Sequence, residues 1–270
     1  MKRWSYEGRW GLITGASAGL GAEFARQLAT RRMSLVLSAR RVERLEQLAS
    51  ELRERHDVEV IVVPADLSRE REAIRLWTAA SAERSIDLLV NNAGFGAQGR
   101  FDEVPVERLA DMVRLNCIAV LELAHAAVRE MRNRGDGGII NVASLAAFQP
   151  VPRLATYAAT KAFVLSLSQA LWAENRDAGV RVVALCPGRT PTEFQGVAGT
   201  GDPRGSFGVL EPEAVVRSAL TALERGKISV VPGLENRLAS VAGRLVPRTL
   251  LTGVLGPIIE RRSQRGRKEW

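Results

Sequence analysis

Three side chains in the middle of the sequence have the types and spacing needed to move a proton. Tyr157 and Lys161 stand four residues apart, so on a helix they share one face, and Ser144 precedes them. A carbonyl carbon that accepts a hydride also needs a proton on its oxygen, which a tyrosine hydroxyl can supply. The pKa of tyrosine is ordinarily about 10, and we expect the charge of Lys161 to lower it. Ser144 would donate a hydrogen bond to the substrate oxygen.

A glycine pattern, TGASAGLG at residues 14–21, predicts a phosphate-binding turn. It follows an apolar run and leads directly into an amphipathic stretch. In that context, glycines let main-chain N–H groups approach a pyrophosphate at a helix N-terminus. The alternative is a glycine-rich turn that binds nothing. The residues assigned here to a cofactor are Gly15, Ser17, Gly19, Leu20 and Gly21.

The end of the next apolar run indicates which nucleotide would bind. A carboxylate at this point would hold the ribose hydroxyls of NAD, but the chain has Arg40 and Arg41 instead. Two guanidinium groups suit a 2′-phosphate, which arginine can bind through two parallel hydrogen bonds. The alternative, a solvated helix start, is disfavoured because cations oppose the dipole there. The pattern favours NADP(H) over NAD(H).

Seven short apolar runs predict the strands that would position these groups. They lie at about residues 9–14, 33–38, 58–63, 86–90, 138–142, 180–186 and 228–231. Nearly continuous apolar runs suit strands covered on both faces, hence a parallel sheet. Helices are expected between them, among them 41–56 and the more apolar 155–176. The alternation predicts an α/β fold with a doubly wound parallel sheet, the Rossmann fold. Residues 196–208, rich in glycine, are expected to form a mobile loop.

In their order and spacing, the motifs resemble the short-chain dehydrogenase/reductase family over roughly residues 8–232. The matching elements are TGASAGLG, Asp66-Leu67, NNAG (91–94), Asn116, Ser144, YAATK (157–161) and Pro187-Gly188 followed by Thr192. The resemblance is to NADP-dependent ketoacyl and carbonyl reductases. It implies that Lys161 also bonds the nicotinamide ribose and that Asn116 holds a water in a proton relay. The further cofactor contacts that it implies are Asp66, Leu67, Asn92, Ala93, Gly94, Tyr157, Lys161, Pro187, Gly188 and Thr192.

Two largely apolar loops are expected to form the substrate wall. The first contributes Leu145, Phe148 and Val151, and the second contributes Phe194. Neither carries a histidine or a carboxylate suited to a sugar or an amine, so we expect an apolar ketone, aldehyde or secondary alcohol. Glu193 either makes a polar contact or is an exposed loop acid. Arg189 departs from the family pattern, and it either faces solvent or reaches a cofactor phosphate or an acidic substrate group.

Composition indicates one globular domain over residues 1–234, followed by a basic, amphipathic extension over 235–270 that packs on or beside it. The chain has 270 residues, 46% of them hydrophobic and 25% charged. Two cysteines and two histidines exclude a disulfide scaffold and leave little for a metal site, so we expect no metal. The absence of a signal-like start and of a long apolar run leads us to expect a cytoplasmic protein.

The extension carries most of the net charge of +8, with seven Arg and one Lys against three Glu. It could cover the substrate pocket, pack in an oligomer or contact an anionic membrane surface. No aromatic residues that could stack bases alternate with its cations, so we expect no nucleic acid. Helix 155–176 is apolar on its remaining faces as well, which predicts a homodimer or homotetramer. The alternative functions are a catalytically idle NADP(H)-binding sensor or scaffold, and a membrane-surface or nucleic-acid binder through the tail.

Overall fold

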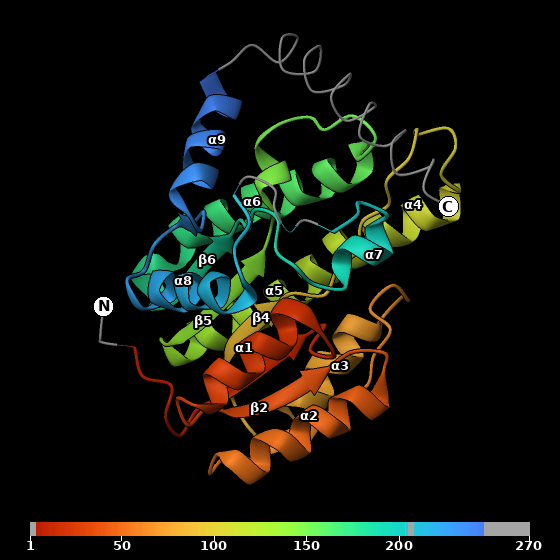
Figure 1. Cartoon of the computed structure of the whole chain (residues 1–270). Coiled ribbons are helices and arrows are strands. Elements are labelled where there is room, and N and C mark those ends of the chain that lie inside the picture. The colour runs from red at the N-terminus through yellow and green to blue at the C-terminus, as the bar shows by residue number, and fades with distance from the viewer. Residues whose placement is uncertain (1–3, 203, 205–207, 246–270) are drawn as a thin grey trace.

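A parallel sheet of seven strands lies at the centre of the fold (Figure 1). The structure is a computed structural model that describes residues 4–202, 204 and 208–245. The strand order is β3-β2-β1-β4-β5-β6-β7, and every neighbouring pair is parallel. The predicted doubly wound sheet is confirmed. The strands are β1 (Trp10–Thr14), β2 (Ser34–Ser38), β3 (Val60–Val62), β4 (Ile86–Asn91), β5 (Gly137–Val142), β6 (Val180–Leu185) and β7 (Ser229–Val230).

Helices cover both faces of this sheet (Figure 1). Nine α-helices lie in the described residues: α1 (Gly19–Ala29), α2 (Val42–Arg55), α3 (Glu72–Ser81), α4 (Val106–Val113), α5 (Ala119–Arg134), α6 (Ala155–Asn175), α7 (Phe194–Ala198), α8 (Pro212–Glu224) and α9 (Leu234–Leu245). Three short segments join them: η1 (Arg114–Ile118), a turn of π-helix, and two 3₁₀ turns, η2 (Leu145–Phe148) and η3 (Arg176–Ala178). The helices expected at 41–56 and 155–176 are present as α2 and α6.

Successive residues of a strand point to opposite faces of the sheet, and each face packs against its own hydrophobic cluster. This explains why the strands are apolar almost throughout. On β1, Ile13 joins a cluster with Phe24 of α1 and Leu220 of α8, whereas Leu12 joins a cluster with Leu76 of α3 and Leu123 of α5. All six side chains are fully buried or nearly so. A strand that is covered on both faces needs apolar residues at consecutive positions, not only at alternate ones.

The strand order reverses between β1 and β4, and this places the chemistry-bearing motifs together. Chain segments leave the carboxyl ends of β1, β4 and β5 at the same edge of the sheet. The glycine turn follows β1, the NNAG motif spans the end of β4, and Ser144 follows β5. The crevice at such a reversal is the usual ligand site of this sheet type.

Two expectations need correction or restriction. The loop expected over 196–208 begins instead with helix α7, which includes residues up to Ala198. Helix α9 starts the C-terminal extension and is attached through buried Asn236 and Ser240, whereas Leu238 and Val241 on it are exposed. The rest of the extension, residues 246–270, lies outside the described residues. In the described part of the chain, no helix has the length and apolarity to cross a bilayer.

Candidate active site

The glycine turn after β1 has the features of an anion site. Helix α1 begins at Gly19, and its N-cap residue Ala18 offers no side-chain hydrogen bond; no acidic residue lies in the first turn. The first N–H groups and the positive end of the helix dipole therefore remain available to an anion. A Cβ on Gly21 would lie 2.2 Å from the carbonyl oxygen of Gly15, so only glycine fits this close approach. The turn thus fits a pyrophosphate.

Asn92 fixes the turn rather than extending away from it. Its Nδ2 donates to the carbonyl oxygens of Thr14, at 2.9 Å, and Gly15, at 3.2 Å. The hydroxyl of Thr14 in turn accepts from the main-chain N–H groups of Asn92 and Ala93, both at 3.0 Å. Thr14, which the sequence analysis did not assign, therefore joins β1 to the loop after β4. The main chain of Ala93 lies against this turn, since a Cβ on Gly15 would be 2.9 Å from the Ala93 Cα, whereas Gly94 lies beside Asn116 and Lys161.

Arginine side chains gather beside the turn, where the sequence predicts a 2′-phosphate. Arg41, the N-cap residue of α2, donates from Nε and Nη2 to Ser17 Oγ at 3.2 and 3.1 Å. Arg40 is exposed close by. Burial would raise the pKa of Asp66, but hydrogen bonds from Ser68 and the charge of Arg40 lower it overall. Leu67, the next residue, is buried.

The structure brings Ser144, Tyr157 and Lys161 together, as the sequence predicts. Tyr157 and Ser144 are joined by a hydrogen bond. Ser144 also caps η2 by accepting from the N–H of Ala146 at 3.1 Å. Lys161, only 5% exposed, donates from Nζ to the carbonyl oxygen of Val142 at 2.8 Å and lies 5.9 Å from the centre of the Tyr157 ring. Helix α6 thus holds two of the groups against the end of β5.

The pKa of Tyr157 moves opposite to the expected direction. Burial raises it to about 12, and the hydrogen bond with Ser144 opposes this rise only partly. Burial lowers the pKa of Lys161 to about 8, against the opposing influence of the thiols of Cys117 and Cys186. The expectation of a lowered tyrosine pKa is therefore wrong for this structure, because burial outweighs the hydrogen bond with Ser144. At neutral pH the tyrosine keeps its proton and the lysine is mostly charged.

Asn116 lies in the π-helical segment η1, a type of irregularity that often marks functional sites. Its Nδ2 donates to the carbonyl oxygen of Phe95 at 3.0 Å and to Thr160 Oγ1 at 3.1 Å, and its Oδ1 accepts from the Phe95 N–H at 3.2 Å. The side chain therefore joins the loop after β4 to α6, the helix of Tyr157. Thr160, inside the YAATK motif, is a partner that the sequence analysis did not identify.

One residue of the predicted substrate wall, Phe194, packs on Tyr157. The ring of Phe194 on α7 is tilted against the Tyr157 ring, with 5.4 Å between the ring centres. Leu145 and Phe148 are half-buried on η2, and Val151 is half-buried in the loop that follows. These four apolar side chains come from the two predicted loops.

The segment after β6 closes the opposite side of the crevice. The carbonyl oxygen of Pro187 accepts from the N–H of Leu145 at 2.8 Å. A Cβ on Gly188 would lie 2.5 Å from the side chain of Asn236, so this glycine packs directly against α9. Thr192 lies over the glycine turn: a Cβ on Gly19 would be 3.1 Å from the Cβ of Thr192.

Two polar residues of this segment had open interpretations. Arg189 is half-buried and donates to the carbonyl oxygen of Thr200 at 3.3 Å, so it does not simply face solvent. Glu193 forms ion pairs with Arg41 and Arg44. Its side chain is exposed, as expected for a loop acid, and it also makes polar contacts, which are these two ion pairs. Arg44 lies three residues after Arg41 on α2, and this spacing is the one sequence signal that could have identified it.

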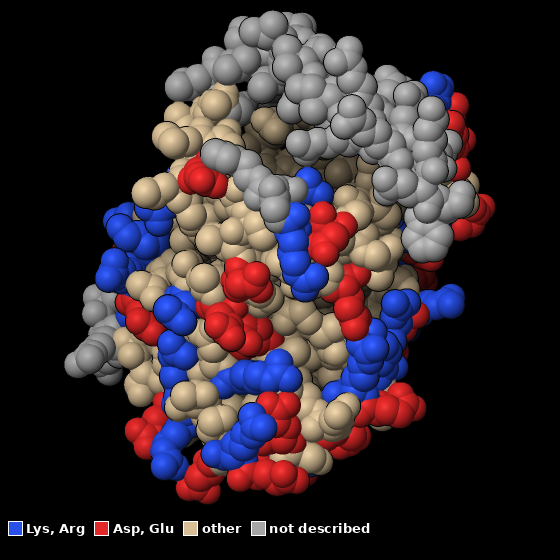
Figure 2. Space-filling model, viewed as in Figure 1, with Lys and Arg blue, Asp and Glu red and all other residues tan. Residues whose placement is uncertain are grey.

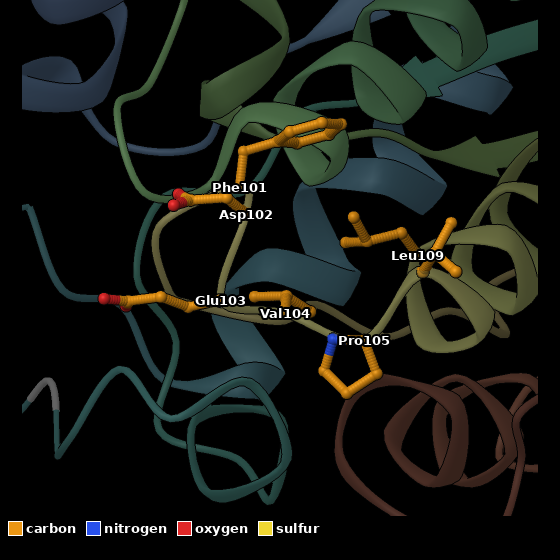
Figure 3. Close-up of a pocket in the computed structure, with 7 residues that line it drawn as sticks. Phe101, Asp102, Glu103, Val104, Pro105 and Leu109 are labelled. Carbon is orange, nitrogen blue, oxygen red and sulfur yellow. The ribbon is translucent and has the colours of Figure 1, made fainter.

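A separate hollow lies on the loop between β4 and α4 and contains none of the predicted site residues (Figure 3). Its lining residues are Phe101, Asp102, Glu103, Val104, Pro105, Val106 and Leu109. On the face drawn in Figure 2, basic and acidic side chains alternate over the surface rather than separating into patches of one sign.

Comparison with known proteins agrees with the geometry. The family model described as "short chain dehydrogenase" matches residues 9–202. The chain belongs to the short-chain dehydrogenase family. A solved structure of this family, a short-chain dehydrogenase from Sphingobium yanoikuyae in complex with NADPH, has 35% sequence identity and a TM-score of 0.80; the match covers 87% of this chain and 92% of that one.

Two curated relatives extend the comparison. Hydroxysteroid dehydrogenase-like protein 1 of Gallus gallus is 34% identical over 182 residues, and the match covers 67% of this chain but 55% of the relative. The chain thus spans about half the length of that relative. The 7beta-hydroxysteroid dehydrogenase of Clostridium sardiniense is 29% identical over 253 residues, covering 94% of this chain and 96% of the relative. Proteins similar to the first, from rat, mouse and human, carry the word "inactive" in their names.

Proposed function

We propose that this short-chain dehydrogenase transfers a hydride between NADP(H) and an apolar ketone, aldehyde or secondary alcohol. The observation that carries the proposal is the convergence of Ser144, Tyr157 and Lys161 beside the glycine turn at one edge of the sheet. A structural role alone does not explain a buried lysine beside a half-buried tyrosine at this edge, since burying a charged group is costly.

The residues present fit the cofactor. The N-terminus of α1 would hold the pyrophosphate, and Arg41 with Ser17 would hold the 2′-phosphate. Asp66 with Leu67 and the main chain of Ala93 and Gly94 would line the adenine and ribose side. Lys161 would donate to the nicotinamide ribose, and Pro187, Gly188 and Thr192 would close the nicotinamide end. When bound, the cofactor supplies or accepts the hydride.

The chain's own residues would manage the proton. With its pKa raised to about 12, Tyr157 is protonated at neutral pH and so enters a reduction as the acid. Ser144 would donate to the same substrate oxygen and stabilise its developing charge. The positive charge of Lys161, 5.9 Å from the ring centre, would favour the tyrosinate left behind. Asn116 would hold the relay water that returns the proton.

The apolar side chains of the two predicted loops support an apolar substrate. Phe194 packs on Tyr157, and Leu145, Phe148 and Val151 are half-buried after β5. Relatives include a 7beta-hydroxysteroid dehydrogenase and very-long-chain 3-oxoacyl-CoA reductases. We therefore expect bulky apolar ketones, steroid-like or acyl, to be better substrates than small polar ones. The test is NADPH oxidation, followed by absorbance, with a panel of ketones that differ in size and polarity. No turnover with any member would refute the proposal.

The second candidate is a catalytically idle NADP(H)-binding protein on the same fold. The names of three related proteins favour it, because they describe those proteins as inactive. The presence of Ser144, Tyr157, Lys161 and Asn116 in one arrangement speaks against it. NADPH binding without turnover across the same panel would support it.

Assembly and location remain predictions. On the outer surface, Ile118 and Leu121 beside and on α5 are 47% and 42% exposed, and Phe163 on α6 is 37% exposed. This apolar surface supports a homodimer or homotetramer. Leu171 and Trp172 of α6 are also apolar, but they pack against the chain's own core and do not belong to this surface. We also keep the expectation of a cytoplasmic protein, in which the basic tail is not a nucleic-acid site.

A further inference from the structure

Glu193 forms an ion-pair bridge between two elements of the cofactor crevice. Its carboxylate accepts from Arg41 Nη1 at 2.8 Å and from Nη1 of Arg44. Both arginines belong to the start of α2, whereas Glu193 is the N-cap residue of α7. The hydrogen bonds from Arg44 and Arg41 hold the pKa of Glu193 below its usual range, so the carboxylate is charged at neutral pH.

The bridge fastens a segment that crosses the whole crevice. The residue before Glu193, Thr192, lies over Gly19 of the phosphate turn. The residue after it, Phe194, packs its ring on Tyr157. Three consecutive residues thus contact the phosphate turn, the arginines and the tyrosine. Any change in the ion pairs of Glu193 acts directly next to the group proposed to move the proton.

The charges at this point favour exchange of the carboxylate for a stronger anion. Arg40, Arg41 and Arg44 carry three positive charges, and Arg41 also donates to Ser17. Glu193 supplies one negative charge. The side chains of Arg41, Arg44 and Glu193 are 43%, 49% and 49% exposed, so each pair is weak and readily broken. A phosphate dianion would compete for the same donors and be repelled by the carboxylate.

We propose that Glu193 sets cofactor specificity by competing with the 2′-phosphate of NADP(H) for Arg41 and Arg44, and that this exchange releases the segment of residues 192–194 from α2. The inference rests on the proposed function, since it assumes that NADP(H) binds here. A cofactor without the 2′-phosphate leaves the ion pairs intact. Occupation of the adenosine end is thereby linked to the position of Phe194 beside Tyr157.

The competition is tested by calorimetric titration with adenosine 2′,5′-bisphosphate and with adenosine 5′-monophosphate. Glu193→Gln should bind the bisphosphate about two- to five-fold more tightly than the wild type, the size expected for an exposed ion pair. Its affinity for the monophosphate should not change. Glu43→Gln is the matched control, because Glu43 is an exposed carboxylate in the first turn of α2 with no ion pair among the described residues. It should change neither affinity.

Two results would overturn the inference in different ways. Unchanged or weaker binding of the bisphosphate by Glu193→Gln would show that the carboxylate does not compete, or that it orients the arginines, while leaving the NADP(H) proposal intact. A wild-type chain that binds both ligands equally would refute the NADP(H) assignment, and the inference with it.

The release of the segment has its own readout. Hydrogen exchange of α7, where the Val197 N–H bonds the carbonyl oxygen of Glu193, reports its opening. The bisphosphate should speed this exchange in the wild type and the monophosphate should not. Without any ligand, Glu193→Gln should exchange about two- to five-fold faster than the wild type. Exchange that is insensitive to the bisphosphate in the wild type would refute the release.

Discussion

The only two tyrosines of the chain lie in two regions with similar surroundings, at opposite ends of the sheet. Tyr6 lies near the amino ends of the strands and Tyr157 near the carboxyl ends. Each packs on another aromatic ring, Trp4 or Phe194, with ring centres 5.9 or 5.4 Å apart. Each also has a cation close to its ring, at 5.7 Å for Arg31 and 5.9 Å for Lys161. Burial raises the pKa of both.

The partners of the two hydroxyl groups differ, and this difference supports the proposal that Tyr157, and not Tyr6, is the acid. The Tyr6 hydroxyl faces acceptors: it donates to the carbonyl oxygen of Leu220 at 3.4 Å, and the carboxylate of Glu224 raises its pKa further. The Tyr157 hydroxyl instead has Ser144, whose hydrogen bond lowers its pKa. Acceptors retain the proton, whereas a neighbouring hydroxyl helps stabilise the oxygen after the proton leaves. Burial and a nearby cation alone do not make a catalytic tyrosine.

The largest effect should come from Tyr157→Phe. The change removes one oxygen and leaves the ring packing against Phe194, so folding and NADPH affinity should be kept. Loss of the general acid should reduce ketone turnover by about 10²- to 10⁴-fold. Turnover and fluorescence-measured NADPH affinity are compared with those of Tyr6→Phe, which should match the wild type in both. Turnover of Tyr157→Phe within a few-fold of the wild type, with NADPH still bound, would show that Tyr157 is not the acid.

Ser144→Ala tests the partner that distinguishes the two tyrosines. Loss of one hydrogen-bond donor to the developing oxyanion should lower kcat by about 10²-fold or more. Ser144→Thr, which keeps the hydroxyl, should retain most of the activity. The pair of variants separates the hydroxyl from the capping of η2, since a loss shared equally by both would assign Ser144 a role in packing instead.

Lys161→Met tests whether the pKa of the lysine beside Tyr157 is lowered, through the pH dependence of the free energy of unfolding. The pKa of Lys161 is lowered from 10.5 to about 8, so between these values the unfolded chain binds more protons than the native one, and stability should rise with pH. The titration of Lys161 should contribute a rise in the free energy of unfolding of about 1.4 kcal/mol per pH unit in the wild type, and this contribution should be absent in the variant. Urea unfolding of the wild type and of Lys161→Met from pH 7.5 to 9.5 gives the difference between their free energies of unfolding. The contributions of the other titrating groups cancel in this difference. Parallel curves would contradict a buried charged lysine.

Sequence patterns predicted the fold, and they also indicated which residues would come together at the candidate site, because both depend on local spacing. The strands are apolar at the residues facing either side of the sheet. The four-residue spacing of Tyr157 and Lys161 places them on one helix face independently of the tertiary structure. The ion pairs of Glu193 could not be predicted, since they join residues about 150 positions apart along the chain. The direction of the Tyr157 pKa was missed for the same reason: burial comes from tertiary packing, whereas the spacing to Lys161 is visible in the sequence.

Tyr6→Phe should have the smallest effect, and its size should depend on pH. The hydrogen bond to Leu220 is long, at 3.4 Å, so its loss should cost about 1 kcal/mol or less near neutral pH. The raised pKa of Tyr6 means that, above about pH 10, the unfolded chain loses this proton while the native chain keeps it. Wild-type stability should therefore fall with rising pH relative to the variant, which has no such proton. Denaturant unfolding of both at pH 7 and pH 10.5 checks this, and a stability difference that does not change with pH would mean that the acceptors around Tyr6 do not retain its proton.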